Sequence, residues 1–142
     1  MKLTIQKVKF AEVKRNEELI SKSKMGYLIL VCFKRNEDID LTKVCIKVLN
    51  LKLFENWKKN IKEVDGDIMI LSQFTLYGKI KGTKPSFHES EEYEIAKNKF
   101  YELINIFKNI YSKEKVFSGV FGEYLEINTC LTGPCTINLE FN

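Results

Sequence analysis

The feature that most constrains the fold is a short apolar run, YLILVCF, at residues 27–33. Its residues are β-prone, and no polar residue alternates with them. Such a run is typical of a central strand that is covered on both faces. The rest of the chain must therefore supply neighbouring strands and the elements that cover the sheet.

Strand patterns occur on both sides of this run. Residues 2–8, KLTIQKV, alternate apolar and polar side chains, and KRNEE within residues 13–20 predicts a hairpin tip between two short strands. Further strands are expected at residues 68–71, 116–121, 124–128 and 137–141.

Two segments have helical spacing. Apolar residues from Leu41 onward predict a first helix, with Asp38 or Asp40 as its N-cap. A longer second helix is expected after Ser86 or Ser90. Its apolar face comprises Tyr93, Ala96, Phe100, Leu103, Phe107 and Ile110. Strands and helices in this irregular order predict an α+β fold, in one domain spanning residues 1–142.

Composition narrows the classes of function. No apolar run approaches the roughly 20 residues of a membrane helix. Lys2, Gln6 and Lys7 interrupt the apolar character that a signal peptide would need. We therefore expect a cytoplasmic protein that does not bind membranes. The net charge of +4 permits an anionic partner such as RNA but does not demand one.

The cysteines and the single histidine bear on metal and hydrolase chemistry. Cys32, Cys45, Cys130 and Cys135 form no C-x-x-C pair, and His88 is far from all of them in sequence. We expect no metal site and no cofactor, and reduced, buried cysteines. A Ser-His-Asp or Cys-His hydrolase would need His88 as its base; the alternative is a solvated histidine at a helix start.

One unusual stretch is ILSQFTLYGKIKGTKPSF, residues 70–87. A buried strand changes abruptly into hydrogen-bonding residues at Ser72, Gln73, Phe74 and Thr75. Either these residues hold a turn at the end of the strand, or a reaction centre lies there. The lysines of the following loop either contact RNA phosphates or are simply solvated; they are Lys79, Lys81 and Lys84.

A second unusual stretch is CLTGPCT, residues 130–136. Taken alone, Gly133 and Pro134 predict a tight connection between two strands, because proline removes a backbone donor from the ladder.

The two stretches together resemble the D-aminoacyl-tRNA deacylase family, of the D-Tyr-tRNA deacylase type. SQFT and the later GPxT carry the resemblance. MKLTIQKV, KVLNLKLFEN, KGTKPSF and GVFGEYLEI agree with the family in the same order, so the resemblance covers the whole chain.

The resemblance implies a small β-barrel-like sheet packed with two main helices, assembled as a homodimer with the site at the interface. It implies a catalytic pocket floor formed by Ser72, Gln73, Phe74 and Thr75. The substrate-binding residues would be Phe87, Gly133, Pro134, Thr136 and Lys7. Gly133 and Pro134 would reach in from the partner, with a cis peptide bond between them.

The implied reaction is hydrolysis of the ester of a D-aminoacyl-tRNA, and of glycyl-tRNA, in chiral proofreading that recycles tRNA. An aminoacyl ester is already reactive, so positioning and oxyanion donors suffice. Backbone N–H groups near Phe74 and Thr75 and the RNA's own 2′-hydroxyl would serve. Thr75 as nucleophile is the alternative, but no base is visible beside it.

Two positions depart from the family pattern. Lys7 stands where the family usually has arginine, and Leu131 where it usually has asparagine. Lysine lacks the planar fork of donors that arginine offers, and leucine has none. A relaxed-chirality or non-catalytic dimer that binds the tRNA end is therefore the alternative function.

Overall fold

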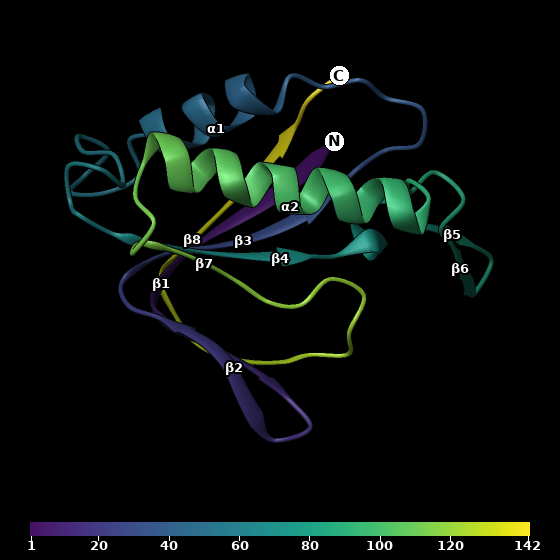
Figure 1. Ribbon diagram of the computed structural model, residues 1–142, viewed down its shortest axis with the longest axis horizontal. Helices are drawn as coiled ribbons and strands as arrows, with labels where there is room; N and C mark the ends of the chain where they lie inside the picture. The colour runs from purple at the N-terminus through teal and green to yellow at the C-terminus, as the bar shows by residue number, and fades with distance from the viewer.

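The computed structural model describes all 142 residues and has an α+β fold, as expected (Figure 1). The strands are β1 (Lys2–Arg15), β2 (Glu18–Ser23), β3 (Gly26–Cys32), β4 (Asp67–Ser72), β5 (Lys79–Lys81), β6 (Lys84–Ser86), β7 (Val116–Ser118) and β8 (Glu126–Glu140). The helices are α1 (Leu41–Asn50), α2 (Tyr93–Ile110) and the short 3₁₀ helix η1 (Phe74–Tyr77).

The main sheet is mixed, with the order β2-β1-β3-β4-β7 and with β8 beside β1. β3 is central, as its apolar sequence predicts: it pairs antiparallel with β1 and parallel with β4. The first half of β1 pairs with β3 and its second half with β2, while β8 follows its other edge. The sheet is nearly closed and barrel-like, which the resemblance also implies.

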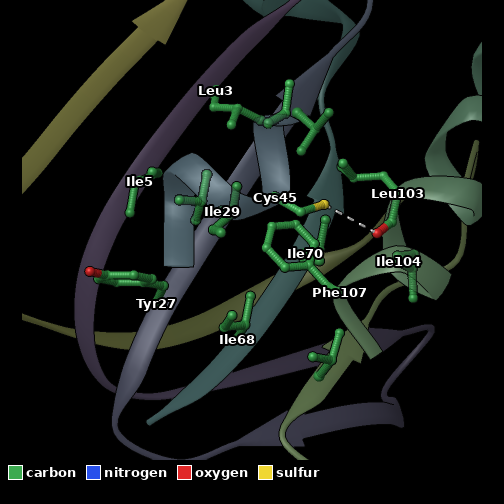
Figure 2. Close-up of a cluster of buried hydrophobic side chains, with 14 of the residues drawn as sticks. Leu3, Ile5, Tyr27, Ile29, Cys45, Ile68, Ile70, Leu103, Ile104 and Phe107 are labelled. Atoms are coloured by element: carbon green, nitrogen blue, oxygen red, sulfur yellow. Dashed lines mark hydrogen bonds between the residues drawn. The ribbon is translucent and has the colours of Figure 1, made fainter. Parts of the chain in front are cut away.

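Both helices lie on one face of this sheet, where the larger apolar core forms (Figure 1). Figure 2 shows Leu3, Ile5 and Ile29 of the strands facing the side chains of the helices. The Cys45 thiol of α1 donates to the Leu103 carbonyl of α2 at 3.9 Å, and burial raises the pKa of Cys45 to about 12. A smaller cluster, which includes Met69, covers the opposite face.

The four cysteines are all free, as expected. Cys32 and Cys45 are buried, which confirms that part of the prediction. Cys130 and Cys135 are only half-buried because they lie on β8, which has the sheet on one side only, so the expectation of burial is wrong for them.

The two helix starts give different outcomes. Asp40 caps α1, and its carboxylate accepts from the Lys43 N–H at 3.2 Å, so this expectation is confirmed. The expected cap of α2 is wrong: α2 follows Glu92, and no side chain caps it. Ser86 belongs to β6, and the Ser90 hydroxyl bonds to η1 instead.

The predicted apolar face of α2 is confirmed in its middle. Ala96, Phe100, Leu103 and Phe107 are buried, and Ile104 joins them. Tyr93 and Ile110 are 54% and 42% exposed because they lie at the two ends of the helix, beyond the edge of the core.

Two expectations about connections are wrong. The lysine-rich loop is a hairpin, β5–β6, which forms a separate two-stranded sheet. Gly133 and Pro134 do not connect two strands; β8 runs through them, and a change of register against β1 accommodates them. The peptide bond between them is cis, as the resemblance implies.

The last part of the chain also differs in its boundaries. β7 ends at Ser118 and β8 begins at Glu126, so the turn around Gly122 is longer than the FGE turn of the sequence prediction. None of the helices combines the length and the apolar character that crossing a membrane requires.

Candidate active site

A cavity of about 590 Å³ opens where β4 ends, and we call it the η1 cavity. η1, the segment leading to α2 and the first turn of α2 surround it, together with the turn between β7 and β8. Five predicted site residues line it: Ser72, Gln73, Phe74, Thr75 and Phe87. The structure therefore brings these five together.

The backbone of η1 offers unused donors at this cavity. Neither the Phe74 N–H nor the Thr75 N–H has a hydrogen-bond acceptor within the chain, whereas the N–H groups of Gln73, Leu76 and Gly78 all do. The first N–H groups of a helical turn have no partner within the turn. Two adjacent donors are thus available to a ligand in the cavity.

The Thr75 hydroxyl has no base beside it. Its oxygen accepts a hydrogen bond from the Gln73 side-chain amide at 2.9 Å. An amide N–H donor cannot remove a proton, so this pair does not resemble the nucleophile–base arrangement of a hydrolase. The arrangement fixes the direction of the hydroxyl rather than activating it.

Sequence reasoning missed two residues that hold η1 in place. Ser90 donates from its hydroxyl to the Phe74 carbonyl at 2.8 Å, and the Cys32 thiol donates to the same carbonyl at 3.4 Å. Both residues line the cavity. Burial raises the pKa of Cys32 above its ordinary value, against smaller lowering effects that begin with Ser90, so the thiol stays protonated and is a poor nucleophile.

One wall of the cavity is aromatic. The rings of Phe74 and Phe87 meet edge to face with centroids 4.9 Å apart, and Phe74 is 56% exposed. Gly78 makes this contact possible, because a Cβ there would lie 2.9 Å from the Phe87 ring. An exposed aromatic face suits an apolar side chain or a nucleobase.

The other predicted site residues lie elsewhere in this chain. Gly133, Pro134, Thr136 and Lys7 do not line the η1 cavity. Gly133 and Pro134 are exposed on β8, at the point where its register against β1 shifts. A single chain therefore presents the two motifs at separate places.

The position of Lys7 on β1 places it opposite the Gly-Pro segment, but its side chain does not contact that segment's carbonyls. The register skips from Gln6 to Val8 on the β1 side, so Lys7 lies opposite the irregular part of β8 that contains Gly133 and Pro134. Its ammonium lies 5.0 Å from the centre of the Phe54 ring, a cation–π contact. It makes no hydrogen bond to the Gly-Pro carbonyls.

His88 does not line the cavity; its Nδ1 lies 2.8 Å from the Ser86 hydroxyl, and the side chain is exposed. The structure thus favours a solvated histidine over a catalytic base. No group of three or more His, Cys, Asp or Glu side chains is placed to hold a metal ion.

Known proteins match this chain over almost its whole length. The family described as D-Tyr-tRNA(Tyr) deacylase matches residues 4–140. A D-aminoacyl-tRNA deacylase of Saccharomyces cerevisiae is 40% identical over 147 residues, covering 99% of this chain and 98% of the relative. One of Drosophila melanogaster is 34% identical, with coverage of 99% and 92%.

Two solved structures agree in fold. The c-Myc DNA unwinding element binding protein superposes with a TM-score of 0.95 at 31% identity, covering 100% of this chain and 99% of that one. A probable eukaryotic D-amino acid tRNA deacylase superposes with a TM-score of 0.82 at 16% identity, covering 97% and 98%.

Fold and cavity define a small α+β protein with a cavity that is lined by backbone N–H groups and an aromatic wall. The full-length match shows that the chain belongs to the D-Tyr-tRNA deacylase family, whose members are hydrolases. The resemblance drawn from the SQFT and GPxT motifs is confirmed.

Proposed function

We propose that this chain hydrolyses the ester bond between a D-amino acid and the terminal adenosine of tRNA, and that the η1 cavity is its active site. Family membership supports the reaction. The observation that supports the location is the pair of free N–H donors at Phe74 and Thr75 beside an aromatic wall. Because aminoacyl-tRNA is used in the cytoplasm, we place the activity there.

The chemistry follows from these donors. When water attacks the ester carbonyl, its oxygen gains negative charge, and two N–H groups already in place stabilise it without reorganising. The free N–H groups of Phe74 and Thr75 would supply this stabilisation, and the RNA's 2′-hydroxyl would assist the attack. Thr75 then orients the substrate and is not acylated, because only the Gln73 amide contacts its oxygen.

Selection between D- and L-substrates requires a second subunit in this proposal. Gly133 and Pro134 are exposed and lie outside the cavity of their own chain, so they are free to enter the cavity of a partner. Their carbonyls would occupy the space that an L-side chain needs. Glycine has no side chain to exclude, so we expect glycyl-tRNA to be a substrate as well.

The surface of β8 also supports a homodimer. Only β1 pairs with this strand, so its other edge is free, and Ile127 and Leu131 are 44% and 46% exposed on it. Free edges and exposed apolar side chains are normally covered in stable proteins. We propose that each protomer is a single domain of residues 1–142 and that two protomers form the site.

The test is hydrolysis of D-Tyr-tRNA and L-Tyr-tRNA by the purified protein. Faster release of tyrosine from the D-substrate supports the proposal. Equal rates would indicate a relaxed-chirality relative, and no hydrolysis of either would indicate a dimer that only binds the tRNA end.

A further inference from the structure

We propose that Lys81 and Lys84, at the tip of the β5–β6 hairpin, bind phosphate groups of the substrate RNA outside the η1 cavity. This inference rests on the proposed function, because it takes an RNA end to be what enters the cavity. It adds a second contact region, distinct from the groups that surround the ester.

The hairpin has no role in the hydrophobic core. It is a two-stranded sheet separate from the main one, and its apolar residue, Ile80, is 70% exposed. An isolated hairpin of this kind is only marginally stable and contributes little packing. Its sequence is therefore not explained by folding alone.

The charge pattern of the hairpin is unfavourable in the free protein. Lys81 and Lys84 are directly opposite each other in the strand register, so their side chains share one face. Like charges in this position destabilise a hairpin. Neither ammonium has an acidic partner, whereas the Lys79 ammonium is bound by Glu89 at 3.0 Å. These two adjacent, unneutralised ammonium groups repel each other, and a bound anion would reduce this repulsion.

The hairpin also lies beside the cavity. It begins just after Gly78 and ends just before Phe87, whose ring packs on Phe74 in the cavity wall. Each of its strands has three residues, so the tip is about 10 Å beyond this base. In Figure 1 the hairpin projects beyond the N-terminal end of α2, the end that lines the cavity. An RNA whose terminal adenosine is in the cavity must carry its preceding phosphates past this region.

The first experiment compares the wild type with Lys81→Ala/Lys84→Ala in binding uncharged tRNA by fluorescence anisotropy, across a series of salt concentrations. Each phosphate contact contributes about 0.7 to the slope of log K against log salt for a single strand. The double variant should therefore lower the slope by about 1.4, and weaken binding about 25-fold at 0.1 M salt.

The matched control is Lys47→Ala/Lys113→Ala, which removes the same charge. Both lysines are exposed and have no acidic partner, on α1 and just after α2. Lys113 follows the C-terminal end of α2, whereas the first turn of this helix lines the cavity, and the 18 residues of the helix span about 27 Å. This control should change affinity less than about twofold, since it removes no phosphate contact. Equal losses in both variants would mean that only net charge matters, and the inference would be overturned.

The second experiment measures hydrolysis of D-Tyr-tRNA and of D-tyrosyl-adenosine, which has no phosphate. We expect the hairpin variant to raise KM for the tRNA substrate and to leave hydrolysis of the nucleoside ester unchanged. Equal loss on both substrates, or none on tRNA, would contradict the inference. If the wild type hydrolyses neither ester, the proposed function fails, and the anisotropy result still decides whether the hairpin binds RNA.

Discussion

At the scale of single residues, Thr75 distinguishes a backbone mechanism from a side-chain nucleophile. Thr75→Ala removes the hydroxyl but keeps the N–H, so we expect the rate on D-Tyr-tRNA to fall less than about tenfold. Thr75→Pro removes an N–H that has no partner in the chain, so it breaks no hydrogen bond of the fold. Because the loss of one oxyanion donor lowers kcat by about 10²–10³, we expect the rate of Thr75→Pro on D-Tyr-tRNA to fall by that factor.

Single-turnover rates of the two variants provide the measurement, with thermal unfolding as the control for an intact fold. If Thr75→Ala is as damaging as Thr75→Pro, the hydroxyl takes part in the chemistry and the backbone account is wrong.

Lys7 and Leu131 carry the second prediction at this scale. The Lys7 ammonium rests on the Phe54 ring and braces no carbonyl of the Gly-Pro segment. In Lys7→Arg/Leu131→Asn, a guanidinium and an amide could hold this segment, and each charge-assisted hydrogen bond contributes about 1.5–3 kcal/mol. We expect hydrolysis of L-Tyr-tRNA to slow about tenfold or more, with the D-rate nearly unchanged. An unchanged D/L ratio would show that other residues brace the segment.

The residues of the cavity differ in how far sequence could predict them. Ser72 to Thr75 are contiguous and break an apolar strand, so they are visible as a motif. Ser90 could not be assigned correctly, because a serine before a helix is also the pattern of an N-cap. Its bond to the Phe74 carbonyl depends on how two separate segments pack, which local pattern does not contain.

At the scale of elements, the start of α2 is fixed by an ion pair instead of a cap. The Lys99 ammonium binds the Glu91 carboxylate at 3.0 Å and the Glu37 carbonyl at 2.9 Å. Burial alone would raise the pKa of Glu91, but the bonds from Lys99 and the Glu92 N–H outweigh it, so the pKa is lowered. These contacts tie α2 to the segment after β3.

We expect Glu91→Gln to destabilise the protein by about 1–2 kcal/mol at pH 7, because one charge-assisted hydrogen bond is lost. A lowered pKa in the folded state means that the stabilisation is present above the unfolded pKa of about 4.3, and is lost as the pH falls through the folded value. Urea unfolding at pH 7 and at pH 3 tests this. The difference between wild type and variant should shrink at pH 3; a constant difference would contradict the ionic account.

The long elements were predictable and the short ones were not. β3 and α2 show their burial in their own apolar pattern, over enough residues for the period to be clear. The β5–β6 hairpin has three residues in each strand and almost no buried side chain, so it leaves no apolar pattern. The sequence predicts two strands, at residues 124–128 and 137–141, in place of β8, because proline usually ends a ladder, whereas here a shift of register accommodates Pro134.

At the scale of the whole molecule, the separation of the two motifs predicts how two chains share a site. We expect light scattering to give twice the chain mass of 16.6 kDa at micromolar concentration. A monomer would contradict a site formed by two subunits. Sequence could place each motif but not this separation, because the distance between SQFT and GPxT depends on the path of the sheet.

Mixing two inactive variants tests the shared site directly. Thr75→Pro disables the cavity. We expect Gly133→Ala to displace the Gly-Pro segment so that it obstructs the partner's cavity for either substrate, because φ is +113° there and a Cβ would lie 2.9 Å from the Cys135 nitrogen. In a mixed dimer, one site combines both disabled parts and the other combines the two intact parts. Random reassortment after unfolding and refolding makes half the dimers mixed, so about a quarter of the wild-type activity should return. Each variant refolded alone is the control and should stay inactive. If the mixture also stays inactive while mixed dimers form, both motifs act within one chain.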